Sequence, residues 1–181
     1  VGCKKGSNET TITGEIKGLG TDTLYLYGMD ELYDRIDTIY VENDKFSYTT
    51  SVDTITSAYL LLKNRIEYPV FLDKGNKIKI KGDTINLNFL TISGNIYNEE
   101  FTDFQKALED PADPSEKAGE ETVDKRITVE KANTAEEMAE EFILQHHSSY
   151  VSLYLLDKYF VQKETPDFSK IKKLVEVMTG V

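Results

Sequence analysis

A series of short segments between residues 10 and 93 constrains the fold more than any other feature of this chain. Polar and apolar residues alternate in several of them, as in 11–16 and 78–81, and turn-forming residues separate one segment from the next. Alternation places one side of a strand inward and the other toward water. Short strands with turn signals about every 8–12 residues predict an antiparallel β-sandwich or a barrel-like sheet domain. The expected strands are residues 11–16, 23–27, 36–41, 45–49, 58–62, 68–72, 78–81 and 87–92.

The periodicity changes from two to three or four residues after Gly94. Asn98 is a residue type that caps helices, and Phe101 and Phe104 follow it at helical spacing. Pro111 predicts the end of this helix, since proline does not continue one. Residues 110–133 are acidic and carry few large apolar side chains, which is typical of an exposed loop, although part of them could form an exposed helix.

Further helices are expected toward the C-terminus. Thr134 and Glu137 have the spacing of a capping box, and a second helix is predicted over about 150–161. Pro166 suits the first turn of a last helix that ends at Gly180. The buried face of that last helix is expected to carry Phe168, Ile171, Leu174, Val175 and Met178.

Together these patterns predict an α+β chain in three parts. An N-terminal tether over residues 1–9 precedes an antiparallel β domain over 10–96. A helical extension of three to four helices follows over 97–181, with the acidic loop at 110–133.

The charge is unevenly distributed, and this argues against one class of partner. The net charge is −11, and residues 97–145 alone contain 15 acidic and five basic side chains. A nucleic-acid-binding surface needs a positive footprint to neutralise phosphates. The composition therefore gives no reason to expect a nucleic-acid partner. The acidic stretch is expected to be a solvated surface, with a cation-binding or basic-partner surface as the alternative.

The N-terminal residues Val1-Gly2-Cys3 resemble the processing site of a bacterial lipoprotein. Cys3 is the only cysteine of the chain and is followed by a polar run. We therefore predict that Cys3 carries lipid and anchors the chain to a membrane outside the cytoplasm. An ordinary free thiol is the alternative.

Candidate catalytic residues are few. The two histidines, His146 and His147, are adjacent in sequence, so on a helix they point about 100° apart and do not converge on one metal. Neighbouring glutamates such as Glu136-Glu137 and Glu140-Glu141 are usually solvated. No metal, cofactor or catalytic residue is predicted. Tyrosines at alternating strand positions could form a glycan-stacking face or be half-buried sheet residues: Tyr25, Tyr27, Tyr40 and Tyr48.

With these elements in order, the chain resembles a known arrangement. It looks like the N-terminal domain of unknown function of lipoproteins from diderm bacteria in which a thioredoxin-like thiol:disulfide oxidoreductase domain follows. That following domain belongs to the AhpC/TSA, TlpA-like or ResA-like group. The resemblance covers about residues 10–180 and rests on residues 12–16, 23–26, 71–78, 92–95, 101–104 and 142–156.

The resemblance implies a lipid-anchored place in the cell envelope of a diderm bacterium, on the periplasmic or outer-membrane side. It also implies a role without catalysis for this chain. Thioredoxin-like chemistry uses a low-pKa thiolate in a WCxxC-type motif, and this chain has no tryptophan and no second cysteine. No catalytic residue is carried over. We expect an accessory module that positions the redox domain, selects its partner or dimerises. The expected partners are the membrane through Cys3, a C-terminal thioredoxin-like domain or another protein, and a second copy. The alternative is a stand-alone envelope lipoprotein that binds a ligand or protein through its sheet face.

Overall fold

The structure, a computed structural model, describes residues 8–109 and 123–180, and for 123–133 the backbone alone. It divides into two compact units, with the boundary between Asp103 and Phe104. The first unit is rich in strands and the second is helical, which confirms the α+β class.

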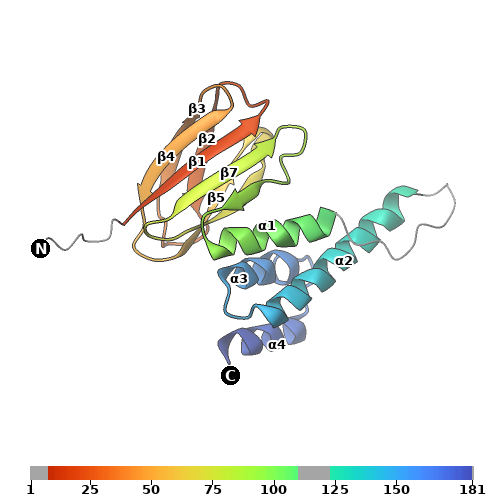
Figure 1. Cartoon of the computed structure of the whole chain (residues 1–181). Helices are drawn as coiled ribbons and strands as arrows, with labels where there is room; N and C mark the ends of the chain where they lie inside the picture. Colours follow the sequence, from red (N-terminus) through yellow and green to blue (C-terminus); the bar gives the residue numbers. More distant parts are fainter. Residues whose placement is uncertain (1–7, 110–122, 181) are drawn as a thin grey trace, which may run out of the picture. The chain divides into compact units, whose positions relative to one another are not determined.

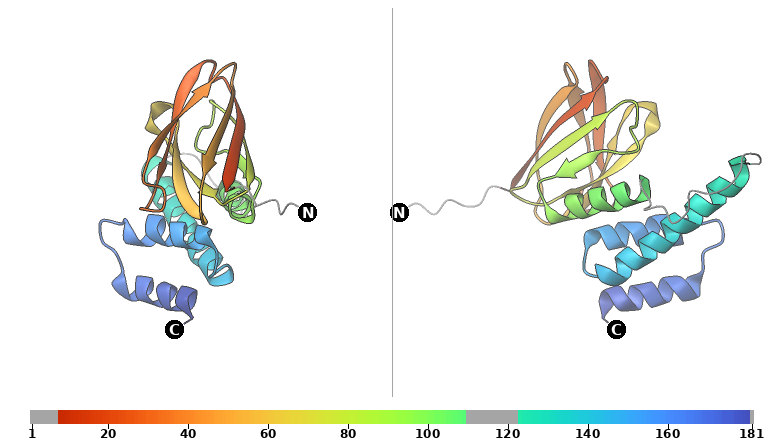
Figure 2. Two further views of the ribbon diagram at one scale, coloured as in Figure 1. Left: turned by 90° about the vertical axis from the view of Figure 1, so that its left-hand side faces the viewer. Right: turned by 45° about the vertical axis from the view of Figure 1, so that its right-hand side comes forward.

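The strands of the described residues form two four-stranded sheets (Figure 1). Sheet A has the order β4-β1-β7-β8, with β4 at Lys45–Ser51, β1 at Glu9–Lys17, β7 at Lys77–Asp83 and β8 at Thr91–Ser93. Sheet B has the order β3-β2-β5-β6, with β3 at Ile36–Val41, β2 at Asp22–Gly28, β5 at Thr56–Leu61 and β6 at Glu67–Leu72. The turned view in Figure 2 shows the two sheets layered face to face.

Alternation along the strands builds the core between the sheets. Leu24 and Leu26 of β2 and Ile78 and Ile80 of β7 are at most 1% exposed, while the residues between them face outward. Burying such aliphatic side chains contributes roughly 1.5–3 kcal/mol each. The predicted sandwich is therefore confirmed, and the first seven predicted strands lie where β1 to β7 are found.

One strand pair departs from the antiparallel prediction. β1 and β7 run parallel, with Ile12 opposite Ile78 and Gly14 opposite Ile80. The four strands of sheet B lie between β1 and β7 in sequence. After them the chain re-enters sheet A, and β7 starts at the same end of that sheet as β1. Parallel pairing requires such a long crossover, and strand periodicity alone does not report direction.

The last predicted strand, at 87–92, is wrong over most of its length. Only Thr91–Ser93 is strand β8, because consecutive turns precede it. Asn86 donates its backbone N–H to Asp83, and Phe89 donates to Asn86. Leu87 and Leu90 are buried three positions apart, a spacing that a strand does not provide.

Helix α1, at Ile96–Glu109, closes the edges of both sheets. The buried Asn98 amide accepts from Phe71 N (2.9 Å) and donates to Phe71 O (2.8 Å) on β6, the edge strand of sheet B. The Thr102 hydroxyl likewise bonds both Ile92 N and Ile92 O, each at 3.0 Å, on β8 at the edge of sheet A. Two side chains thus satisfy backbone groups that an edge strand would otherwise leave unpaired.

The predicted capping role of Asn98 is therefore wrong. Asn95 caps the helix instead, because its side chain accepts from Asn98 N at 2.9 Å. Asn98 lies three residues after this cap, inside the helix, and its side chain forms hydrogen bonds with β6.

The second unit contains the remaining helices. These are α2 at Val123–Gln145, α3 at Tyr150–Leu156, the π-helical turn η2 at Asp157–Val161, and α4 at Phe168–Thr179. Its core includes Ala139, Ile143, Leu155 and Phe160. The predicted helix over 150–161 corresponds to α3 and η2, and Ser149 caps it by accepting from Val151 N.

Several helix boundaries differ from the predictions. α2 begins at Val123, within the stretch expected as a loop, so Thr134 lies inside a helix and does not cap it. Residues 110–122 lie outside the described part of the chain. Pro166 lies before α4 and not in its first turn, because Asp167 caps the helix: its carboxylate accepts from Ser169 N and Lys170 N.

The predicted end of α4 at Gly180 is confirmed by its left-handed φ of 70°. The predicted buried face of α4 is only partly correct. Leu174 is 2% exposed, whereas Phe168 is 76% and Val175 39% exposed.

Candidate functional site

The outer face of sheet A is a polar surface that we call the lysine face. Successive outward residues of β7 are Lys77, Lys79 and Lys81. The strand register places hydroxyl side chains of β1 and β4 beside the first two lysines, and places Glu15 and Lys45 beside the third. The hydroxyl residues beside the lysine row are Thr11, Thr13, Ser47 and Thr49.

The lysines of this face are available to an external anion. Among the described residues, the ion pairs involve none of Lys45, Lys77, Lys79 and Lys81. All four are exposed. Ammonium groups and hydroxyls together offer many donors. The chemistry of the face suits an anionic or polyhydroxyl surface.

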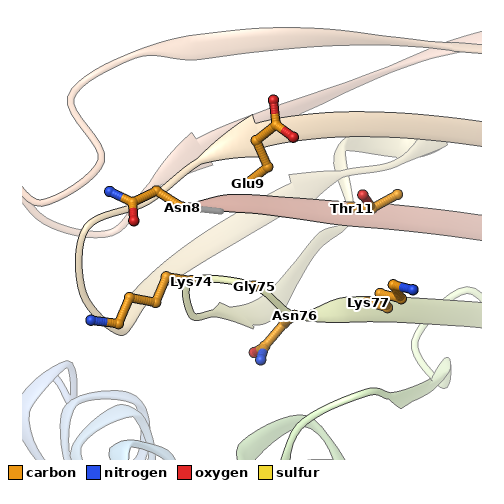
Figure 3. Close-up of a pocket in the computed structure, with 7 residues that line it drawn as sticks. All are labelled: Asn8, Glu9, Thr11, Lys74, Gly75, Asn76 and Lys77. Atoms are coloured by element: carbon orange, nitrogen blue, oxygen red, sulfur yellow. The ribbon is translucent and has the colours of Figure 1, made fainter. Parts of the chain in front are cut away.

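An open hollow of about 650 Å³ lies where β1 and β7 begin (Figure 3). Its lining includes Asn8, Lys74, Asn76 and Lys77, from the chain entering β1 and the turn before β7. The Asn76 side chain already accepts from Asn95 at 2.8 Å, and Asn8 donates to Asp53 at 2.9 Å. Glu9 and Asn76 point to opposite sides in Figure 3, so the polar groups do not converge on one point.

A second, shallower hollow of about 300 Å³ lies farther along the same face. Lys45, Lys79 and Lys81 line it together with Thr13 and Glu15, and Gly14, Phe46 and Ile80 complete the lining. The two hollows share β1 and β7, so they mark the ends of one continuous lysine face.

The outer face of sheet B has a different character, and we call it the tyrosine face. Tyr25 is 41%, Ile36 73% and Tyr40 72% exposed, while Tyr27 and Tyr59 are half-buried. Leucines at 24 and 26 point to the core, so alternation forces these tyrosines outward. The ring centres of Tyr27 and Tyr59 are 5.8 Å apart.

Charge is scarce on the tyrosine face. Tyr27 donates its hydroxyl hydrogen bond to Glu67 at the start of β6. Burial, and then this bond and the Glu67 charge, raise the pKa of Tyr27. Three of the four tyrosines singled out in the sequence are thus gathered on this face, whereas Tyr48 lies on β4 of sheet A.

Sequence reasoning missed a polar cluster beside β3 and β4. Tyr33 donates to Asp37 and lies 3.1 Å from the Thr50 hydroxyl, and Arg35 Nε donates to Asp37 at 3.1 Å. Arg35 also donates to Thr50 and to Ser51 O, and its guanidinium lies 4.5 Å from the Tyr33 ring centre. The cluster joins the edge of sheet B to the edge of sheet A.

The cluster shifts the pKa values of its members, including those of Tyr33 and Asp37. Burial, and then the hydrogen bond to Asp37, raise the pKa of Tyr33 to about 12. Burial alone would raise the pKa of Asp37, but hydrogen bonds from Tyr33, Tyr48 and Arg35 outweigh it, and the pKa is lowered. The spacing Tyr33-x-Arg35-x-Asp37 was the available signal, yet it does not reveal that Thr50 lies alongside.

The remaining predicted residues do not form a site. His146 stacks on Phe142 with ring centres 4.4 Å apart, and the adjacent His147 is exposed. Glu136 and Glu140 form ion pairs with Lys163 (2.5 Å) and Lys170 (2.7 Å), respectively. Cys3 lies outside the described residues.

The described residues contain neither a candidate metal cluster nor a candidate membrane-spanning helix. Within residues 8–109 and 123–180, no three His, Cys, Asp or Glu side chains are grouped so that they could hold a metal ion. In the same residues, no helix combines the length and apolar character needed to cross a bilayer.

The fold and its surfaces define a β-sandwich domain of mostly antiparallel strands, closed by a helix and followed by a helical unit. Residues 10–101 match the family model described as "Domain of unknown function (DUF4369)", and the chain belongs to this family. The match covers the eight described strands apart from Glu9 of β1, and the part of α1 that carries Asn98. No curated protein matches the chain.

Proposed function

We propose that this chain is a non-catalytic binding and positioning module of a cell-envelope lipoprotein. In this proposal, lipid on Cys3 anchors the chain to the membrane, and a thioredoxin-like thiol:disulfide oxidoreductase domain follows it. The module positions that domain, selects its partner or dimerises. It acts on the periplasmic or outer-membrane side of a diderm envelope.

The tyrosine face is the observation that carries the proposal. Soluble proteins rarely leave large contiguous apolar patches exposed unless they bind something. Tyrosine is also favoured in binding surfaces, because its ring is large and loses little rotational freedom. Tyr25, Ile36 and Tyr40 meet this description on adjacent strands.

The construction of the sandwich supports a passive, rigid role. Asn98 and Thr102 bond the edge strands β6 and β8 from a single helix, which blocks strand addition at those edges. The sheet faces and the opposite edges, β3 and β4, are left for binding. Membership of the DUF4369 family supports the part of the resemblance that concerns a domain of unknown function over residues 10–101.

The second candidate is a stand-alone envelope lipoprotein that binds a glycan or protein on its own. The same tyrosine face favours it, since aromatic rings stack on sugars as well as on protein side chains. The two candidates differ in whether a redox domain belongs to the same polypeptide.

The native polypeptide distinguishes them. An antibody to this chain is used to recover the protein from cell membranes after labelling with an alkyne fatty acid, beside a strain carrying Cys3→Ser. We expect a lipid-labelled species larger than 20.6 kDa by about 100–150 residues, and loss of the label in Cys3→Ser. A labelled species near 20.6 kDa would favour the second candidate, and an unlabelled one would contradict the anchor.

A further inference from the structure

We propose that the lysine face of sheet A lies against the anionic surface of the membrane that holds the tether, so that the tyrosine face is directed away from the lipid. This inference deepens the proposed function and rests on its lipid anchor. The partner is a bilayer leaflet containing anionic phospholipid.

The local charge of the lysine face has the sign that such a surface attracts. The outward residues of β1, β4 and β7 contain five lysines and three carboxylates. They are Lys17, Lys45, Lys77, Lys79 and Lys81, with Glu9, Glu15 and Asp83. The net charge of the whole chain is −11, so the lysine face has a local charge of the opposite sign.

Screening makes this local excess more important than the net charge. The Debye length is about 8 Å at physiological ionic strength. Sheets of a sandwich lie about 10 Å apart, so charges beyond sheet B are more than one Debye length from a surface that touches sheet A. The membrane therefore responds mainly to the face that approaches it.

The length of the tether keeps this face within reach. Five Cα-to-Cα steps lead from Cys3 to Asn8, where the described chain begins. Fully extended, they span at most about 18 Å. Asn8 lines the hollow at the start of β1 together with Lys74 and Lys77 (Figure 3). A lipid on Cys3 would therefore hold these two amines close to the head groups.

The lysine face is also shaped for a flat polar contact. The Ser47 hydroxyl and one of the paired Thr11 and Thr49 hydroxyls (3.5 Å apart) can donate to phosphate oxygens, whereas Thr13 already donates to Ile78 O at 3.3 Å. The strand register gives no large apolar side chain among these residues. Lys77, Lys79 and Lys81 follow one another at about 7 Å along the strand. Each lysine near an anionic leaflet favours the docked orientation by about fivefold, so two or three suffice to orient a tethered domain.

Two features of the sequence make a direct test simple. Cys3 is the only cysteine, so it couples the whole chain to a maleimide lipid whether or not the cell lipidates it. The chain has no tryptophan, so a single one reports position. One protein carries Ser47→Trp on the lysine face and another carries Thr38→Trp on the tyrosine face. Fluorescence quenching by a spin-labelled head group is then measured on phosphatidylglycerol-containing and on pure phosphatidylcholine vesicles.

We expect stronger quenching of the Ser47→Trp protein than of the Thr38→Trp protein on anionic vesicles, and no difference on neutral ones. Adding Lys77→Gln and Lys79→Gln should reduce the orientational preference by about 25-fold, at about fivefold per lysine. The matched control is Lys172→Gln with Lys173→Gln on α4, which should leave the preference unchanged.

Equal quenching at the two positions on anionic vesicles, or equal effects of the two lysine pairs, would overturn the inference. The chemical coupling separates this result from the proposed function. An unlabelled native Cys3 would remove the natural anchor, while the vesicle experiment would still report whether the lysine face docks.

Discussion

Asn98 shows how one side chain can hold an edge of this sandwich. It is 1% exposed and bonds both backbone groups of Phe71, at 2.9 and 2.8 Å. Asn95 also donates to Phe71 O at 2.9 Å, so this carbonyl has a second partner. The Phe71 N–H, in contrast, is bonded by Asn98 alone among these side chains. A buried donor without an acceptor costs about 1–3 kcal/mol.

Asn98→Ala should therefore lower the free energy of unfolding by about 1–3 kcal/mol. Urea denaturation of the full chain measures this, with Asn88→Ala as the matched control because Asn88 is exposed. A loss in Asn98→Ala no larger than in the control would show that the edge does not depend on this amide.

The polar cluster around Tyr33 predicts a dependence of stability on pH at both extremes. The pKa of Tyr33 is raised from 10.0 to about 12, so its contribution is complete below pH 10 and is lost as the pH rises through about 12. The pKa of Asp37 is lowered from 3.8, so its contribution is present above that value and is lost as the pH falls through the folded-state pKa.

Tyr33→Phe should remove the loss of stability above pH 10 that ionisation of Tyr33 causes. It should also reduce the loss of stability at acid pH that protonation of Asp37 causes. Thermal unfolding across pH measures both, with Tyr40→Phe as control because the Tyr40 side chain is 72% exposed. An alkaline slope identical in Tyr33→Phe and in the unsubstituted chain would contradict the hydrogen-bond network.

At the scale of elements, strand periodicity predicted seven of the eight strands because their faces differ in environment. Ile78 and Ile80 are buried while Lys77 and Lys79 are exposed, and the sequence records that contrast directly. The segment at 87–92 lacks it, since local turns set its conformation. The parallel pairing of β1 and β7 depends on the crossover and leaves no periodic trace.

Tertiary contacts explain why the helix caps were less predictable. Asn95 and Asn98 are both good caps by residue type, and only contact with Phe71 assigns them different roles. For the candidate site, alternation predicted the outward tyrosines of β2 and β3. It did not predict the joining of Tyr33 to Thr50, which are far apart in sequence.

Helix α4 is held mainly by one buried side chain and by ion pairs to α2. Leu174 is 2% exposed, and Lys170 pairs with Glu140 at 2.7 Å and with Glu136 at 3.7 Å. Exposed pairs contribute about 0–1 kcal/mol, whereas a leucine-to-alanine change in a core costs about 2–5 kcal/mol.

Leu174→Ala should therefore detach α4 locally. Hydrogen–deuterium exchange should speed up at the amides of α4 and stay unchanged in the strands, which belong to the other compact unit. Val177→Ala is the control, since Val177 is 39% exposed. Equal acceleration by both substitutions would argue against Leu174 as the anchor.

For the whole molecule, we propose different roles for the two sheet faces: the lysine face contacts the membrane and the tyrosine face contacts a partner. The lysine face carries unpaired cations and hydroxyls, and the tyrosine face carries aromatic and aliphatic side chains with little charge. A tethered domain that docks through the first face presents the second to a partner. The acidic balance of the chain lies largely in residues 97–145.

Site-specific photo-crosslinking in the native envelope tests the central claim most directly. A benzophenone amino acid replaces Tyr40 on the tyrosine face or Ser47 on the lysine face, both of which are exposed. The account predicts crosslinks from position 40 to a thioredoxin-like domain, within the same polypeptide or in a partner, and none from position 47. Equal crosslinking from the two positions, or crosslinks to that domain from position 47 alone, would contradict it.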